Sequence, residues 1–187
     1  MQNSVYLPEE DSFFMSDFIK NKFVFLVLQN PEIKVLEIGC GSGINLKSFS
    51  EIGIKKQNIF SCDINSEAVE YCQKLGFENC VVSDLFEKFS NEKFDFIFFN
   101  PPYLPEEISE PEDSKLITTG GKSGNEISIR FLKDAKNFLK QNGKIYLITS
   151  SLSEKIDFEN LGYKFKLIGE RKLFFEKLFL WELKQFI

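Results

Sequence analysis

Short apolar runs alternate with longer amphipathic segments along most of this chain. Three amphipathic segments have the apolar spacing of helices, and they begin at Ile44, Asn65 and Ser123. The apolar runs between them are typical of strands buried on both faces of a parallel sheet. The five expected strands are residues 34–38, 58–63, 80–83, 94–99 and 144–149.

Polar and glycine residues mark where the helices should begin and end. Asn65 is an expected N-cap, and Gly76 is an expected terminator of the same helix. Ser123 and Glu126 have the spacing of a capping box, and Gly143 is expected to end the helix that they open.

The two ends of the chain complete the predicted fold. Residues 12–28 have helical spacing, although 23–28 could equally be a strand. Residues 163–173 and 177–183 are two strands too close for a crossover helix, so they should pair antiparallel. Residues 103–124 have no periodicity and form an expected long loop. The prediction is an α/β fold, a doubly wound, mostly parallel sheet closed by an antiparallel hairpin.

Composition limits the classes of function. The chain of 187 residues is expected to form one domain, and its 43% hydrophobic and 27% charged residues are ordinary for a globular protein. We find no apolar run long enough for a membrane span and no signal peptide, so the cytoplasm is the expected location. A net charge of −5 makes nucleic acid an unlikely partner.

Cysteine and histidine usage narrows the chemistry. The four cysteines contain no C-x-x-C pair and there is no histidine, so we expect buried thiols and no metal site. Without histidine, catalysis must depend on carboxylates, carboxamides, the backbone or positioning.

The first candidate site is a glycine loop. Gly39, Gly41 and Gly43 follow the first predicted strand, where they would allow a sharp turn and close approach of a ligand. The pattern is G-x-G-x-G, with Ile44 where a dinucleotide fingerprint would have its third glycine. Glu37 precedes the loop and would repel a pyrophosphate but suit a cationic ligand such as S-adenosylmethionine. A tight turn without a ligand is the alternative.

Acidic residues end the next two strands. Asp63 follows Gly43 by 20 positions, the spacing at which a carboxylate meets a ribose diol. Asp84 is placed to accept a hydrogen bond from an adenine amine. A charge at a helix N-terminus is the alternative for Asp63.

The sequence Asn100-Pro101-Pro102-Tyr103 directly follows the fourth strand. The Asn100 oxygen and the Pro101 carbonyl could accept hydrogen bonds from both N–H groups of a planar NH2 group, while Tyr103 lies against its plane. The tandem prolines would stiffen the turn. A rigid turn without catalytic function is the alternative. Together with Glu37 and the two aspartates, this sequence indicates an N-methyltransferase.

With these motifs, the chain resembles the HemK-type methyltransferases, which modify the glutamine of the GGQ motif in class I translation release factors. The resemblance is to the archaeal and eukaryotic branch. It extends over nearly the whole chain, in the blocks Val5-Tyr6-x-Pro8-x-x-Asp11-Ser12-Phe13, residues 36–43, 63–65, 83–86 and 94–105, and Gly120-Gly121-x-x-Gly124-x-Glu126.

The resemblance implies a Rossmann-like class I methyltransferase. Its sheet would have seven strands, with helices on both faces, and the helical segment 1–33 would contribute to the active site. The implied cofactor is S-adenosylmethionine, with contacts from Ser12, Glu37, Gly39, Asp63, Asp84, Leu85 and Asn100. The implied substrate side comprises Tyr6, Pro8, Asn100, Pro102 and Tyr103.

The resemblance also implies partners. Only some 33 residues precede the first strand, so the release-factor-docking domain of the bacterial branch is not expected. The archaeal and eukaryotic branch uses a small zinc-binding activator protein, which here would pair with the edge strand Cys80–Val82 near Phe77.

Other functions share some of these features. The Asn-Pro-Pro-Tyr sequence also suits methylation of adenine or cytosine in nucleic acid, or of protein lysine. A binding module that has lost turnover is a further alternative. An NAD-dependent dehydrogenase is disfavoured by Glu37 and Ile44.

Overall fold

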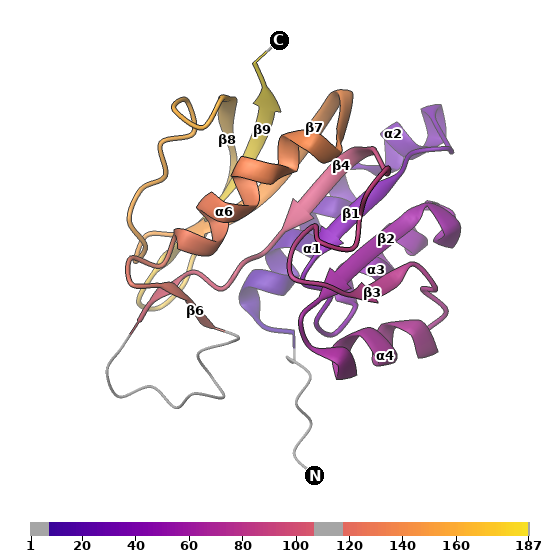
Figure 1. Ribbon diagram of the computed structural model, residues 1–187, viewed down its shortest axis with the longest axis horizontal. Helices are drawn as coiled ribbons and strands as arrows, with labels where there is room; N and C mark the ends of the chain where they lie inside the picture. The colour runs from indigo at the N-terminus through magenta and orange to yellow at the C-terminus, as the bar shows by residue number, and fades with distance from the viewer. Residues whose placement is uncertain (1–7, 107–117, 187) are drawn as a thin grey trace.

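The computed structural model describes residues 8–106 and 118–186, and in this part of the chain a seven-stranded sheet forms the centre of the molecule (Figure 1). The strand order is β3-β2-β1-β4-β7-β9-β8. The strands are β1 Val35–Ile38, β2 Ile59–Asp63, β3 Cys80–Val82, β4 Phe94–Phe99, β7 Leu139–Ser150, β8 Tyr163–Lys172 and β9 Lys177–Gln185.

Five strands of the sheet run parallel, and β9 pairs antiparallel with both β7 and β8. All four residues of β1 are buried, as expected for a strand covered on both faces. β1 lies between β2 and β4, so the connections leave in opposite directions on its two sides. In such sheets, ligands bind at the carboxyl ends of the strands where the order reverses.

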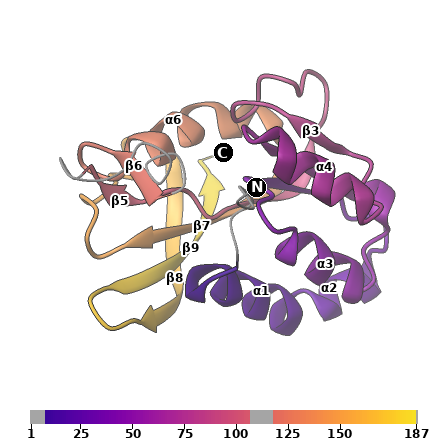
Figure 2. The same cartoon turned by 90° about the horizontal axis from the view of Figure 1, so that it is seen from below.

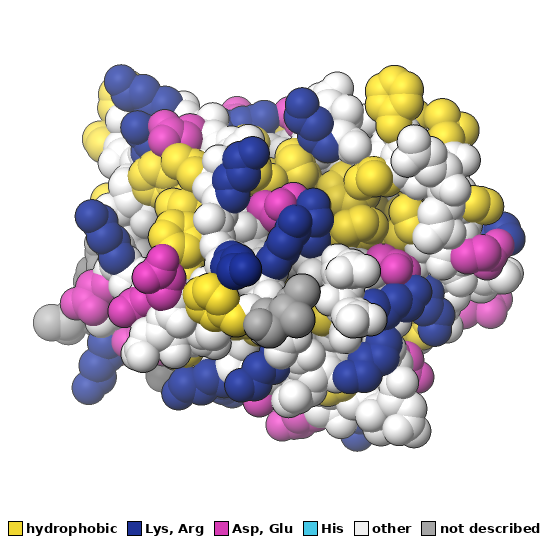
Figure 3. All heavy atoms as spheres, turned by 90° about the horizontal axis from the view of Figure 1, so that it is seen from above, with side chains coloured by type: hydrophobic (Ala, Val, Ile, Leu, Met, Phe, Trp, Pro, Cys, Tyr) yellow, Lys and Arg dark blue, Asp and Glu magenta, His cyan; other side chains and the backbone are white. Residues whose placement is uncertain are grey.

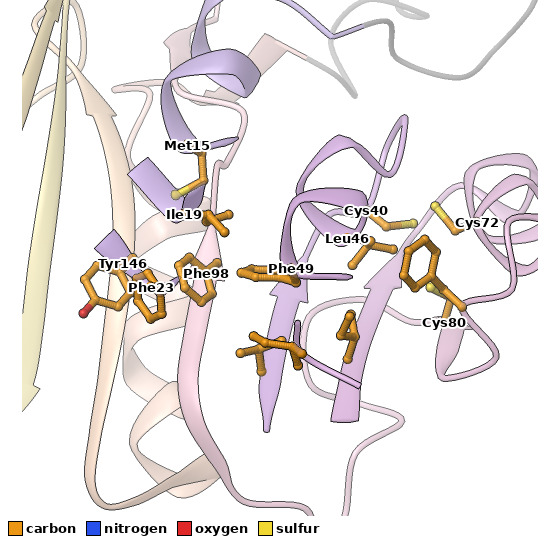
Figure 4. Close-up of a cluster of buried hydrophobic side chains, with 14 of the residues drawn as sticks. Met15, Ile19, Phe23, Cys40, Leu46, Phe49, Cys72, Cys80, Phe98 and Tyr146 are labelled. Atoms are coloured by element: carbon orange, nitrogen blue, oxygen red, sulfur yellow. The ribbon is translucent and has the colours of Figure 1, made fainter. Parts of the chain in front are cut away.

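Helices cover both faces, as predicted (Figure 2). The helices of the first face contribute to one core cluster, in which Met15, Ile19 and Phe23 approach Phe98 and Tyr146 (Figure 4). The second cluster includes three buried residues of α6. The bounds are α1 Glu10–Lys22, α2 Val24–Gln29, α3 Ile44–Glu51 and α4 Ser66–Lys74 for the first face and α6 Glu126–Ala135 for the second.

The segment predicted as one helix over 12–28 is two helices that meet at Phe23, and the strand alternative is wrong. The Phe23 side chain is 1% exposed and packs edge-on against Phe96 and Phe98, with ring centroids 4.9 and 5.3 Å apart. Burying such a ring contributes roughly 1.5–3 kcal/mol. Phe23 therefore anchors the junction of the two helices to the sheet.

The predicted bounds of the third amphipathic helix need correction at both ends. The helix begins at Glu126 and its N-cap is Asn125, so Ser123 does not cap it. The reciprocal half of the capping box is formed, because Glu126 Oε1 accepts from the Ser123 N–H at 2.9 Å. The helix ends at Ala135, well before Gly143, because Leu139 already pairs with Phe94 as part of β7.

A small second sheet interrupts the expected 103–124 loop. The strands β5, Leu104–Pro105, and β6, Thr119–Gly121, pair parallel next to the Asn-Pro-Pro-Tyr segment. None of the helices in the described part of the chain is long and apolar enough to cross a bilayer.

Candidate active site

Four polar side chains gather at the carboxyl edge of the sheet. Glu37 is the last residue but one of β1, Asp63 ends β2, Asp84 follows β3 and Asn100 follows β4. These four strands are consecutive neighbours and parallel, so their carboxyl ends share one edge, the lower edge in Figure 1 onto which Figure 2 looks. The predicted line of acceptors is thereby brought together.

The glycine loop is held in shape by Asp63. Gly39, Gly41 and Gly43 have φ values of 76°, 44° and 70°, a region that glycine enters without steric cost. Asp63 Oδ2 accepts from the Gly41 N–H at 2.9 Å, and Asp63 Oδ1 accepts from the Asn65 N–H at 2.9 Å. Burial raises the pKa of the Asp63 carboxyl, and the Asn65 and Gly41 N–H groups oppose that rise.

Glu37 presents a buried oxygen to the same region. Its side chain is only 4% exposed, and Oε1 accepts from Asn45 Nδ2 at 2.7 Å. Oε2 has no hydrogen-bond partner among the described residues. Burial raises the pKa of the Glu37 carboxyl well above its usual value. A buried acidic group with an unused oxygen suits a ligand with a positive charge and hydrogen-bond donors.

Asp84 and Leu85 form the turn after β3. Asp84 Oδ1 accepts from Arg130 Nη2 of α6, in an ion pair whose side chains are 40% and 54% exposed. Leu85 is buried and has a φ of 48°, which is uncommon for a residue with a branched side chain. Strain of this kind is concentrated at functional sites.

Asn100 is oriented by a residue that the sequence reasoning left without a role. Asn100 Nδ2 donates to Asp11 Oδ2 at 2.9 Å, and the Tyr103 hydroxyl lies 3.5 Å from the same oxygen. Asn100 Oδ1 is buried without a hydrogen-bond partner among the described residues. The only indication of this role in the sequence was the position of Asp11 in the N-terminal block that resembles the HemK-type methyltransferases, between Pro8 and Ser12.

The backbone of the Asn-Pro-Pro-Tyr segment is braced from two sides. Ser153 Oγ donates to the Tyr103 carbonyl at 2.6 Å. Gly120 of β6 lies so close that an added Cβ would be 2.6 Å from the Pro102 carbonyl oxygen. A recess of about 360 Å³ opens beside this segment and is lined by Glu9, Glu10, Asp11, Phe13, Tyr103, Leu173 and Glu176.

The N-terminal candidates are only partly described. Ser12 is buried at the start of α1, and its backbone N–H donates to Asp11 Oδ1 at 2.6 Å. Ser12 therefore lies beside the pair of Asp11 and Asn100. Pro8 is half-buried two residues before α1, whereas Tyr6 lies outside the described residues.

The four cysteines lie in the interior. All four are buried and unbridged, as predicted. Within residues 8–106 and 118–186, no three His, Cys, Asp or Glu side chains are grouped as metal ligands.

A glycine loop after β1, an acid at the end of β2 and an Asn-Pro-Pro-Tyr segment after β4 define a class I N-methyltransferase. Residues 19–166 match the family described as methyltransferase small domain. The chain belongs to this family and, within it, to the HemK-type methyltransferases.

Relatives from archaea to humans support this assignment. A Methanocaldococcus jannaschii protein, assigned as a protein N5-glutamine methyltransferase, is 38% identical over 93% of this chain and 88% of its own length. Human methyltransferase HEMK2 is 32% identical over 79% of this chain and 72% of its own. A chain of the E. cuniculi Mtq2–Trm112 complex, which methylates the eRF1 termination factor, superimposes with a TM-score of 0.68 at 25% identity. It covers 97% of this chain and 99% of its own.

Proposed function

We propose that this protein transfers a methyl group from S-adenosylmethionine to the side-chain N5 of the glutamine in the GGQ motif of a class I translation release factor. The observation that carries the proposal is the buried Asn100 Oδ1, which has no partner among the described residues and lies at the carboxyl edge of the sheet. Relatives named as glutamine or eRF1 methyltransferases support the choice of substrate.

The cofactor would bind along β1, β2 and β3. Glu37 Oε2 would accept from its ammonium group, Asp63 from its ribose hydroxyls and Asp84 from its adenine amine. Gly39, Gly41 and Gly43 would allow the backbone to approach it, with Ser12 and Leu85 as further contacts. When bound, the cofactor supplies an electrophilic methyl group on a sulfonium.

Asn100 and Pro101 would act on the target amide. Its nitrogen is a weak nucleophile because the lone pair is delocalised into the carbonyl. Asn100 Oδ1 and the Pro101 carbonyl would accept from its two N–H groups, which favours the tetrahedral nitrogen of the transition state. As the new N–C bond forms, the bond between the methyl carbon and the sulfonium sulfur breaks and leaves a neutral thioether. One N–H of the methylated nitrogen becomes strongly acidic and its proton passes to water, so no histidine is required.

The rest of the site would position the substrate. Tyr103 would lie against the amide plane, Pro102 would stiffen the segment, and Tyr6 and Pro8 would contact the substrate chain. The recess beside Asp11 and Tyr103 gives that chain a route to Asn100. We propose that residues 1–187 work as one catalytic domain, of which 1–33 complete the active site, and that the protein acts in the cytoplasm.

A small activator of the Trm112 type is the proposed partner, because the Mtq2 relative is found in complex with Trm112. The edge strand β3 is bonded only to β2 within the described sheet, and Val82 at its end is 46% exposed. Phe77, expected near this interface, is 2% exposed and belongs to the core, so it cannot contribute apolar surface there.

The test is transfer of radiolabelled methyl from S-adenosylmethionine to a release factor, measured with a Trm112-type partner present. We expect labelling that disappears when GGQ is changed to GGN and falls by ~10²–10³ in the Asn100→Ala variant. Absence of label with the partner present would overturn the proposed substrate. Labelling of an oligonucleotide or of a protein lysine instead would show that the substrate is a different one.

A further inference from the structure

Among the described residues, only Asp11 forms a hydrogen bond with the Asn100 carboxamide, although the two residues are 89 positions apart. Asp11 is the second residue of α1 and is 7% exposed. Oδ1 accepts from the Ser12 N–H at 2.6 Å. Oδ2 accepts from Asn100 Nδ2 at 2.9 Å and lies 3.5 Å from the Tyr103 hydroxyl.

A carboxamide can be turned by 180° with almost no change in shape, which exchanges its oxygen and its NH2 group. An ionised carboxylate only accepts hydrogen bonds, so Asp11 pairs with Nδ2 and repels Oδ1. A hydrogen bond to a charged group contributes about 1.5–3 kcal/mol, enough to populate one orientation strongly over the other. The carboxylate thus decides which end of Asn100 faces away from α1.

The end that faces away is the end that the chemistry needs. Oδ1 is an acceptor without a partner among the described residues, suited to an incoming N–H group. With the carboxamide reversed, Nδ2 would meet the target NH2 donor to donor. The negative charge also polarises the carboxamide and makes Oδ1 a stronger acceptor.

We propose that Asp11 is the positioning residue of this active site, which fixes the orientation of the Asn100 carboxamide and strengthens its oxygen as an acceptor. The inference rests on the proposed function, since it concerns the same Asn100 oxygen. It makes α1, and not only the sheet, a determinant of the turnover rate.

The test is a double-mutant cycle on methyl transfer to the release factor, with kcat and the cofactor Kd measured for each variant. Asp11→Ala should lower kcat by ~10²–10³, as for loss of a preorganised polar contact. Asp11→Asn, which keeps an acceptor but loses the charge, should retain part of that activity. In the Asn100→Ala background, Asp11→Ala should cost less than about threefold more, because residues that act through one another are not additive.

Asp17→Asn is the matched control. Asp17 lies on the same helix, its side chain is 60% exposed and it pairs with Arg171, so kcat should be unchanged. A merely structural Asp11 would give equal losses with and without Asn100, or would raise the cofactor Kd without a loss in kcat, and either result overturns the inference. If the unchanged protein transfers no methyl to the release factor, the proposed function fails instead. If the unchanged protein is active and Asp11→Ala keeps full activity, the positioning role of Asp11 is refuted but the proposed function is not.

Discussion

The substitution Gly120→Ala tests whether β6 holds the Asn-Pro-Pro-Tyr segment in place. Gly120 does not have a positive φ, so an alanine there is not strained by its own backbone conformation. Its Cβ would nevertheless lie 2.4 Å from the Gly124 carbonyl oxygen and 2.6 Å from the Pro102 carbonyl oxygen. Both atoms are backbone, so they cannot rotate out of the way.

The size of the effect follows from this geometry. An ordinary carbon contact begins near 3.5 Å, so the Pro102 backbone must move by about 1 Å. Pro102 lies between Pro101 and Tyr103, and a displacement of this size at a reacting centre costs about 10²-fold in rate. That loss corresponds to about 2.7 kcal/mol of transition-state stabilisation. Cofactor affinity should change little, because Glu37 and Asp63 are held by other strands.

The assay compares kcat, the cofactor Kd from calorimetry and the unfolding temperature. Gly143→Ala is the matched control, because its Cβ would lie 3.0 Å from the backbone oxygens of Lys140 and Phe94, at the opposite end of β4 from Asn100. That variant should lose stability and keep its kcat. If folded Gly120→Ala retains kcat within about threefold of the unchanged enzyme, β6 does not position the segment and the reasoning is refuted.

Three further predictions concern the cofactor edge and the fold. Asp63→Ala should weaken cofactor binding before it affects the kcat at saturation, and calorimetry showing unaltered affinity would contradict the role of Asp63. Glu37→Gln should gain stability relative to the unchanged protein as pH rises. Burial raises the pKa of Glu37 above its unfolded value of 4.5. The contribution of the protonated Glu37 to the free energy of unfolding is therefore fully present below pH 4.5 and is lost as the pH rises through the raised pKa. Unfolding temperatures between about pH 5 and about pH 8 measure the difference, which a pH-independent gap would disprove. Asn65→Ala removes a side chain that accepts from the Glu67 N–H, so urea unfolding should show a loss of about 1 kcal/mol, against little change for exposed Ser66→Ala.

The parts of the fold that the sequence predicts well are those with a strong local signal. Phe94–Phe99 is apolar at every position except Asp95 and is followed by the polar Asn100, and it forms β4 with those bounds. The hairpin of β8 and β9 could be predicted because too few residues separate its strands for any other connection. Acidic residues at the ends of successive parallel strands must meet at one edge, so the placement of these side chains at a common edge could be predicted as well.

Local sequence patterns fail to predict the structure where long-range packing determines it. The apolar spacing of α6 continues through Phe138 and Leu139, but pairing of Leu139 with Phe94 draws that residue into β7. The strands β5 and β6 are too short to produce an alternating pattern. The contact between Asp11 and Asn100 leaves no periodic pattern in the sequence, because it forms only when α1 packs at the edge of the sheet.

The unused acceptors connect stability with function. Glu37 Oε2, Asn45 Oδ1 and Asn100 Oδ1 are buried without partners among the described residues. Each unsatisfied group costs about 1–3 kcal/mol, in a fold whose total stability is about 5–15 kcal/mol. These three oxygens lie on or beside the neighbouring strands β1 and β4, so the fold maintains unpaired acceptors at one edge; the fourth such atom, Asn58 Nδ2, precedes β2 at the opposite edge. The ammonium group of the cofactor at one end of this edge and the NH2 group of the target at the other would supply hydrogen-bond donors to them. The free energy that folding loses by burying these oxygens without partners is therefore recovered when donors bind to them.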